Sequence, residues 1–309
     1  GVQAGAAMST AAGSSTARAG LLLALAGSIA FSGKAIIVKL AYRHGVDAVT
    51  LIMYRMLFAL PLFLGLSWWA TYRSAKPVIP LTRRDWLGIL GLGFSGYYAA
   101  SLLDFWGLQY ISASLERLIL YLNPTLVLAL GWLLYRRPIR ARQYGAMALS
   151  YGGMLLVFGH ELSFEGRATL IGGGLVFASA ISYALYLVYS GELVKRLGSL
   201  RLVGLATSVA CLLCLLQFLL LRPLSAAIVA PEVIWLSLLN AVACTAAPVI
   251  MVMMAIERIG SGLTAQIGMV GPLSMIAMGV WLLGEPFDGW VLAGTVLVLS
   301  GVLWVTRAR

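Results

Sequence analysis

Residues 113–132 read ASLERLILYLNPTLVLALGW, a segment that is long and apolar enough to cross a bilayer. It nevertheless contains the charged pair Glu116–Arg117 and the helix breaker Pro124. A charged side chain inside a membrane costs about 2.5–3.5 kcal/mol even on permissive insertion scales. We interpret the segment as a helix that faces a polar cavity along part of its length. The structural alternative is an acidic helix start, favoured by the helix dipole, with Arg117 at the membrane interface.

The composition of the whole chain is that of a polytopic membrane protein. Hydrophobic residues make up 61% of the 309 residues and charged residues only 11%, whereas about a quarter of a soluble domain is charged. The net charge of +11 lies mostly in short loops between apolar runs, so it indicates membrane orientation rather than nucleic-acid binding. We therefore predict an all-α integral membrane fold.

Apolar runs between charged or Pro/Gly-rich breaks predict ten transmembrane helices. They cover residues 19–42, 48–71, 86–109, 112–135, 141–159, 169–192, 200–221, 232–256, 261–283 and 287–306. The loops on one side hold most of the Lys and Arg, and those on the other side hold only Arg43, Arg167 and Arg222. Because Lys and Arg concentrate in cytoplasmic loops, we predict that the N- and C-termini are both cytoplasmic.

The segment around Pro124 has a counterpart in the second half of the chain. A shift of 148 residues aligns YISASLERLILYLNPTLVLALGWLLYRRPI (110–139) with RIGSGLTAQIGMVGPLSMIAMGVWLLGEPF (258–287), which places Pro124 on Pro272 and Gly131 on Gly279. Each half then holds five spans, and an odd number makes the second copy enter the membrane from the opposite side. Such inverted repeats build alternating-access transporters, whose site lies where discontinuous helices meet. Pro124 and Pro272 are candidates for those discontinuities.

The residues that close the ninth span, Gly284-Glu285-Pro286, together with two five-span halves resemble the EamA type of the drug/metabolite transporter superfamily. The resemblance covers the chain from about residue 18 onward. It departs from the family pattern in the first half, where Arg136-Arg137-Pro138 replaces Gly-Glu-Pro. The resemblance implies export of a small metabolite, commonly an amino acid or related compound, across the bacterial inner membrane.

These observations divide the chain into three parts. Residues 1–18 are expected to be a cloning remnant followed by a disordered cytoplasmic tail, because GVQAGAA precedes Met8 and the next residues are small and polar. Residues 19–159 and 169–309 are expected to be the first and second EamA-like five-helix repeats.

Ionisable residues inside the predicted spans are the main candidates for a site. Lys34 either lines a cavity or is a fixed partner of Asp104, and both interpretations stay open. Asp104 shares a helical face with Tyr97 and Ser101, which predicts a polar stripe toward a cavity. Arg55 is expected to brace a neighbouring helix rather than to contact substrate.

The predicted substrate-binding set draws on both halves, and its cationic side favours a carboxylate-bearing or zwitterionic substrate. Its members are Lys34, Tyr97, Tyr98, Ser101, Asp104, Arg117, Tyr121, Asn123, Tyr183, Tyr186 and Gln266. Asp104 and Glu116 are candidates for proton coupling, although either could be locked in a salt bridge. Arg55, Pro124 and Pro272 are assigned structural roles.

The sequence gives little support to other classes of function. No Walker-type phosphate loop is present, and two isolated histidines offer neither a metal site nor the catalytic cluster of a membrane enzyme. We expect no cofactor. An exchanger or facilitator without proton coupling is the first alternative, and an integral membrane enzyme a remote one. The expected partners are a small metabolite, protons and membrane lipid, with the chain a monomer or homodimer.

Overall fold

The computed structural model describes residues 2–73, 78–259 and 270–307, and these residues contain helices and no β-strand. The all-α prediction is confirmed for this part of the chain. The elements are α1 (Val2–Tyr42), α2 (Ala48–Tyr72), α3 (Arg83–Gly93), η1 (Phe94–Ala99), α4 (Ala100–Gly107), α5 (Ala113–Leu120), α6 (Asn123–Tyr135), α7 (Ala141–Glu165), α8 (Arg167–Tyr189), α9 (Gly191–Leu197), α10 (Ser199–Leu221), η2 (Leu224–Ala227), α11 (Pro231–Ala241), η3 (Val242–Ala246), α12 (Ala247–Ile259), α14 (Val270–Leu283) and α15 (Gly289–Arg307).

Seven helical segments among the described residues are long and apolar enough to cross a membrane. They are Ser15–Tyr42, Ala48–Tyr72, Arg83–Gly107, Ala113–Tyr135, Arg167–Tyr189, Leu200–Leu221 and Pro231–Val252. The other three expected spans do not meet these criteria. Residues 141–159 lie in α7, residues 261–283 are only partly described, and 287–306 contain the shorter apolar helix Gly289–Gly301. Ten spans therefore remain a prediction.

Three of the long segments are interrupted near their middle. The segment 113–135 is divided into two helices: α5 ends at Leu120, and α6 begins at Asn123. Pro124 stands in the first turn of α6, where its missing N–H is tolerated. The two other interruptions are the π-helical segments η1, between α3 and α4, and η3, between α11 and α12. Such π-segments occur often at functional sites.

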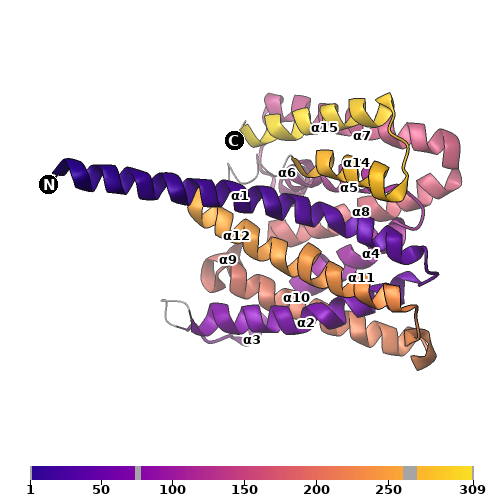
Figure 1. Cartoon of the computed structure of the whole chain (residues 1–309), viewed down its shortest axis with the longest axis horizontal. Coiled ribbons are helices and arrows are strands. Elements are labelled where there is room, and N and C mark those ends of the chain that lie inside the picture. The colour runs from indigo at the N-terminus through magenta and orange to yellow at the C-terminus, as the bar shows by residue number, and fades with distance from the viewer. Residues whose placement is uncertain (1, 74–77, 260–269, 308–309) are drawn as a thin grey trace.

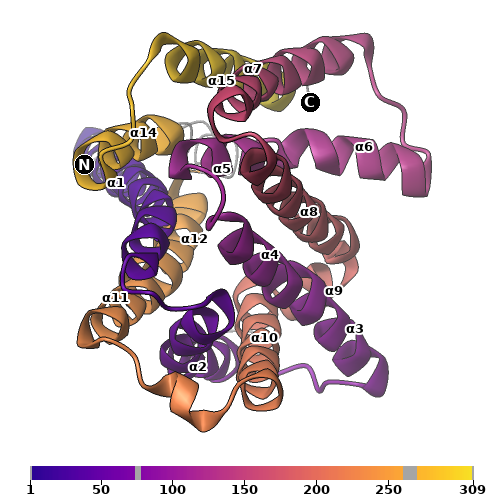
Figure 2. The same ribbon diagram turned by 90° about the vertical axis from the view of Figure 1, so that its right-hand side faces the viewer.

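The helices pack in pairs that bring distant parts of the chain together. α2 lies along α10, and α7 lies along α15 at the top of both views (Figure 1, Figure 2). α1 packs against α12 and α14, while α8 packs against α4 and α6. α1 also contacts α11, so it touches the helices on both sides of η3, and α8 also contacts α5, so it touches both helices of the segment broken at Pro124.

The α7–α15 contact depends on glycine. A Cβ added to Gly153 would lie 2.5 Å from the carbonyl oxygen of Gly294 and 2.8 Å from the Cβ of Leu297. Small residues at such positions let two helices approach closely inside a membrane, where packing rather than hydrophobic burial drives their association. A Cβ added to the neighbouring Gly152 would meet no atom within 4 Å.

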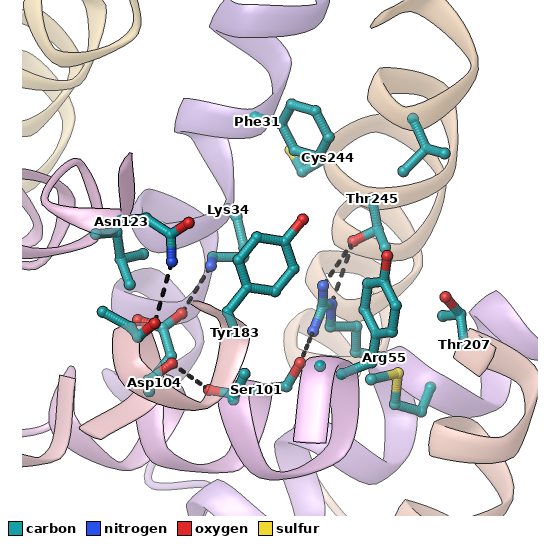
Figure 3. A pocket seen from close by; sticks show the side chains of 18 of the residues that line it. Phe31, Lys34, Arg55, Ser101, Asp104, Asn123, Tyr183, Thr207, Cys244 and Thr245 are labelled. Carbon is teal, nitrogen blue, oxygen red and sulfur yellow. Dashed lines mark hydrogen bonds and ion pairs between the residues drawn. The ribbon is translucent and has the colours of Figure 1, made fainter. Parts of the chain in front are cut away.

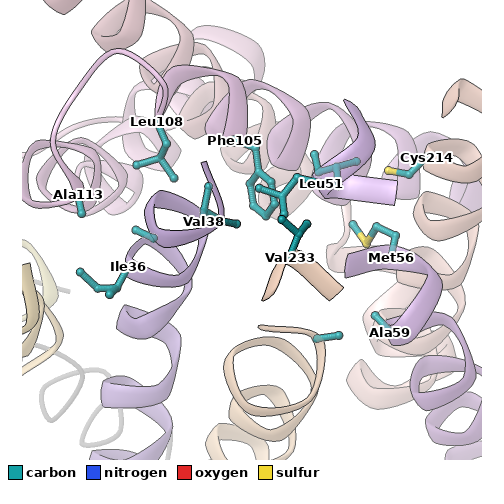
Figure 4. Packing of buried hydrophobic residues seen from close by; sticks show 14 of the residues in the cluster. Ile36, Val38, Leu51, Met56, Ala59, Phe105, Leu108, Ala113, Cys214 and Val233 are labelled. Carbon is teal, nitrogen blue, oxygen red and sulfur yellow. The ribbon is translucent and has the colours of Figure 1, made fainter. Parts of the chain in front are cut away.

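The largest apolar core fills the space between α1, α2, α4, α10 and α11. Phe105, Leu51 and Val233 meet there, with Met56 and Cys214 toward α10 (Figure 4). Phe105 and Val233 are fully buried. This core closes one side of the polar cavity described below and fixes the position of α4 against α2.

The N-terminal segment differs from its prediction. Residues 2–18, expected to form a disordered tail, are the first turns of α1, which extends beyond the rest of the bundle (Figure 1). Ala, Ser and Thr dominate these turns. The alanines carry high helix propensity, and α1 continues directly into its apolar part without a helix breaker.

Candidate functional site

A cavity of about 290 Å³ lies among the interrupted helices. This volume is near the lower end of the range of about 300–1,000 Å³ found for small-molecule sites. The lining residues come from ten elements, and they are Phe31, Lys34, Arg55, Met56, Phe63, Gly96, Tyr97, Ala100, Ser101, Asp104, Arg117, Leu120, Asn123, Ser179, Ala180, Tyr183, Thr207, Cys244, Thr245 and Val249. Both π-segments and the break at Pro124 border the cavity, so the irregular backbone lies beside a cavity rather than beside lipid.

Lys34 and two carboxylates form a charged cluster on one side of the cavity. The Nζ atom of Lys34 lies 2.7 Å from Oδ2 of Asp104 and 3.7 Å from Oε1 of Glu116. The side chains of Asp104 and Glu116 are 3% and 0% exposed. Apart from Lys34 and each other, the two carboxyl groups have no hydrogen-bond partner among the described residues. Lys34 is therefore shared by both carboxylates; its pairing with Asp104 was one of its two interpretations, whereas its contact with Glu116 was not anticipated.

Arg55 lies on another side of the cavity and is held by neutral groups. Its Nε and Nη2 atoms donate to Oγ1 of Thr245 at 3.2 and 3.1 Å, and Nη1 donates to Oγ of Ser101 at 3.4 Å. The guanidinium also stacks over Phe105 at 5.1 Å. Figure 3 shows these bonds apart from the Lys34–Asp104 pair. The expected bracing role is visible in these bonds, yet Arg55 also lines the cavity.

Arg117 and Asn123 contribute polar groups from the broken helix. Arg117 donates from Nη2 to the carbonyl oxygen of Phe31 at 3.0 Å, while its buried Nε has no hydrogen-bond partner among the described residues. Asn123 donates from Nδ2 to the carbonyl oxygen of Ala180 at 3.0 Å. Both side chains therefore face inward, and the break at Pro124 lets one segment present them from two short helices.

Three tyrosines form an aromatic wall. The rings of Tyr97 and Tyr186 meet edge to face at 5.2 Å, and the rings of Tyr183 and Tyr186 stack at 5.5 Å. Tyr97 and Tyr183 line the cavity. Tyr186 is 4% exposed and lies behind them, with its hydroxyl 3.5 Å from that of Tyr97.

The cavity brings together most, but not all, of the residues expected at a site. Lys34, Tyr97, Ser101, Asp104, Arg117, Asn123 and Tyr183 line it, with Glu116 and Tyr186 directly behind. Tyr98 instead packs against Phe94 and the apolar core. The hydroxyl of Tyr121 lies near Gly271 of α14, outside the lining. Gln266 lies outside the described residues, and Pro272 stands in the first turn of α14.

Several lining residues were not anticipated, chiefly Cys244 and Thr245 of η3 and Thr207 of α10. A signal for two of them was present in the sequence. The shift of 148 residues that aligns the two prolines also aligns Tyr97 with Thr245 and Gly96 with Cys244. All four of these residues line the cavity.

Polar contacts tie helices together at the end of the bundle where α1 ends and α2 begins. Glu285 accepts from the backbone N–H of Ala113 at 2.9 Å and from Oγ of Ser114 at 3.2 Å, which caps α5. His160 of α7 contacts Asp288, just before α15, at 2.7 Å. These contacts join α5 and α7 to the segment between α14 and α15.

At the same end, Asp47 caps α2 and pairs with Arg222 at 3.1 Å. Burial alone raises the pKa of Asp47, but hydrogen bonds from Thr50 and from Arg222 outweigh it and hold the pKa below its ordinary value. The ion pair therefore favours the ionised carboxylate and links the loop before α2 to the end of α10.

The described residues contain no group of three or more His, Cys, Asp or Glu side chains arranged to hold a metal ion. The three cysteines are buried and unpaired. The polar groups of the cavity lining are thus ammonium, guanidinium, carboxylate, hydroxyl, amide and one thiol, that of Cys244.

A protein family, a transporter from Bacillus subtilis and a solved structure each match most of this chain. The EamA-like transporter family matches this chain at residues 18–159 and 170–307. The uncharacterized transporter YcbK of Bacillus subtilis (strain 168) is 30% identical over 275 residues, which span 87% of this chain and 86% of that protein. A crystal structure of a protein with 14% sequence identity superposes with a TM-score of 0.65 and covers 94% of this chain and 99% of its own. That structure supports the fold alone.

Proposed function

Because the chain belongs to the EamA-like transporter family, we propose that it is a secondary transporter that exports a small carboxylate-bearing metabolite by alternating access. That it is a membrane transporter follows from the family and from the relative in Bacillus. The proposed substrate class rests on one observation. A cavity in the bundle is lined by three cationic side chains and one carboxylate, and a carboxylate substrate supplies negative charge that the lining lacks.

The proposed architecture is ten spans in two inverted five-helix repeats, residues 19–159 and 169–309. The sequence shift of 148 residues supports it, because it carries η1, beginning at Phe94, onto η3, beginning at Val242. The packing is consistent with the same exchange of halves: α1 meets α12 as α8 meets α4, while α2–α10 and α7–α15 each pair the corresponding helices of the two halves. In such folds one half rocks against the other around a fixed site.

We further propose that the protein lies in a bacterial inner membrane with both termini in the cytoplasm. The excess of Lys and Arg in the loops on one side supports this orientation. The end tied by Glu285 and by Asp47–Arg222 is then the outer end. The protein acts as a monomer or homodimer, since the cavity is complete within one chain.

Proton coupling is assigned to Asp104 and Glu116. Two buried carboxylates that share one ammonium are a natural place for a transferable proton, because both cannot easily stay ionised beside a single cation. The alternative is exchange or facilitated flux without protons. Its support is the short Lys34–Asp104 distance, which favours a permanently ionised pair.

Counterflow in proteoliposomes tests the proposal. Purified protein is reconstituted into liposomes loaded with a carboxylate at high concentration, and uptake of trace labelled carboxylate is measured. A carrier gives transient accumulation that saturates, whereas a channel gives none. Arg117→Gln should abolish accumulation, while Arg258→Gln, which changes an exposed arginine at the end of α12, should retain it. Absence of accumulation for every carboxylate offered would refute the proposed substrate class.

An imposed pH gradient then separates the two coupling modes. Proton coupling predicts that the gradient alone drives accumulation and that Glu116→Gln abolishes this drive while leaving counterflow intact. An exchanger predicts no response to the gradient. Matched measurements on the same liposome batch, with a protonophore added to half, distinguish these outcomes.

A further inference from the structure

The carboxylates near the cavity have a cationic partner, whereas two of the cations have no carboxylate partner among the described residues. Lys34 is 2.7 Å from Asp104 and 3.7 Å from Glu116, so both carboxylates at the cavity face the same ammonium. Asp104 is the one carboxylate in the described part of the chain that lines the cavity, and Glu116 lies behind it. Among the described residues, therefore, no carboxylate is left over for the ammonium group of a bound substrate.

The two arginines of the cavity, by contrast, are hydrogen-bonded to neutral groups. Arg55 is 7% exposed, and its hydrogen-bond partners among the described residues are the hydroxyls of Thr245 and Ser101. Arg117 donates to a backbone carbonyl, and its buried Nε has no partner among the described residues. Neither guanidinium lies within ion-pair distance of a described carboxylate. Both retain N–H donors for an anion, and a desolvated guanidinium without a counter-charge is costly.

The rest of the lining is apolar or aromatic. Tyr97 and Tyr183 present ring faces and edges, and Phe31, Met56, Leu120 and Val249 add hydrocarbon. A volume of about 290 Å³ accommodates one small molecule. The cavity thus offers guanidinium groups for one anionic group and an apolar wall for the remainder.

From this pairing of charges we infer that the substrate is a small organic acid with one carboxylate and an apolar or aromatic body, and that it carries no ammonium group. The inference rests on the proposed carrier function and sharpens it, because that function admits amino acids equally. Even with both carboxylates ionised, the three cations leave the cavity with an excess of one positive charge. An anion neutralises that excess, whereas a zwitterion leaves it unchanged and adds an ammonium without a carboxylate partner.

The test uses matched solutes that differ only at the α-carbon, where a hydroxyl replaces an ammonium of nearly the same size. Phenyllactate is compared with phenylalanine, and the α-hydroxy analogue of leucine with leucine, in counterflow with the wild-type protein. Protein-free liposomes correct for passive leakage of the acids. We expect the hydroxy acids to be taken up at least about tenfold better, as for a buried charge that finds no partner.

Each outcome decides the matter. Preference for the amino acids, or equal uptake within a pair, overturns the inference while leaving the carrier function intact. Uptake of neither member of any pair, by protein that elutes as a single species, refutes carboxylate transport itself and the inference with it. Ligand-dependent thermal stabilisation of the purified protein gives a second measurement of the same ranking, independent of transport.

Two variants probe the cause. Arg55→Gln should reduce hydroxy-acid uptake to the background of protein-free liposomes, and Arg55→Lys should restore part of it with the preference unchanged. Lys34→Gln releases Asp104 and Glu116, so the preference for the hydroxy acid should shrink about tenfold or reverse. A variant Lys34→Gln that folds and keeps the full wild-type preference would show that unpaired carboxylates do not set the selectivity.

Discussion

Replacement of Lys34 by Met should destabilise the protein more than any other single change in the charged cluster. Lys34 is the only described cation within ion-pair distance of Asp104 and Glu116, whose oxygens have no other hydrogen-bond partner apart from each other. Its removal leaves two almost fully buried carboxylates facing each other. Removing one partner of a buried ion pair typically costs about 3–5 kcal/mol. We expect Lys34→Met to fall in that range.

The same geometry predicts a smaller cost for Asp104→Asn. Lys34 then keeps Glu116 at 3.7 Å, so no charge is stranded and the loss is about 1–2 kcal/mol. The triple variant Lys34→Met/Asp104→Asn/Glu116→Gln removes all three charges at once. Neutral replacement of a buried ionic cluster is often neutral or stabilising. The triple variant should therefore be close to wild type and more stable than Lys34→Met alone.

Thermal unfolding followed by tryptophan fluorescence in one detergent provides the assay. At roughly 2 °C per kcal/mol for a chain of this length, Lys34→Met should lower Tm by about 6–10 °C and Asp104→Asn by about 2–4 °C. The order of the variants matters more than the absolute shifts. If the three substitutions add, so that the triple variant is the least stable, then Lys34 does not neutralise the carboxylates and the reasoning is refuted.

Three further predictions concern packing, pH and access. Gly153→Ala should cost about 1–3 kcal/mol, because its Cβ would overlap the backbone of α15, whereas Gly152→Ala should be neutral or stabilising; equal Tm values would contradict the close approach. The pKa of Asp47 is depressed in the folded state, so the ionised carboxylate contributes to stability above its unfolded pKa of about 4. That contribution is lost as the pH falls through the folded pKa. Asp47→Asn should therefore lower Tm at about pH 7 and not near pH 3. Cys244 lines the cavity, so in a variant that keeps only this cysteine, substrate should slow its labelling by a small thiol reagent; unchanged labelling at saturating substrate would argue against this site.

The helices that border the cavity could be predicted in their main features from the sequence. Pro124 fixed the break between α5 and α6, because proline cannot donate the backbone bond that a continuous helix needs. Tyr97, Ser101 and Asp104 line the cavity together, as their spacing along one helical face predicted. Lys34 lines the cavity and pairs with Asp104, so its two interpretations are not exclusive, and its contact with substrate stays a prediction.

Other parts of the site could not be reached by the same reasoning. Tyr121 was predicted in the substrate-binding set, and its backbone N–H still bonds the carbonyl oxygen of Arg117 as in a helix, but its hydroxyl lies near Gly271 and outside the lining. Thr245 gave no signal of its own, because a single threonine in an apolar helix usually bonds its own backbone. In the structure it accepts two bonds from Arg55, which is 190 residues away in sequence. Partners so distant are set by packing, and only the internal alignment pointed to that position.

The distribution of charge around the cavity is consistent with a fold that works by moving one half against the other. All charged lining residues, Lys34, Arg55, Asp104 and Arg117, come from residues 19–159, whereas residues 169–309 contribute hydroxyl, thiol and aromatic groups. The Lys34–Asp104 pair therefore stays within one half. The bonds of Arg55 to Thr245 cross between the halves, but they join a charge to a neutral hydroxyl. Contacts of that kind cost less to break than a buried ion pair. Since no described ion pair joins the two halves at the cavity, the halves can separate there without leaving a buried charge that has lost its ionic partner.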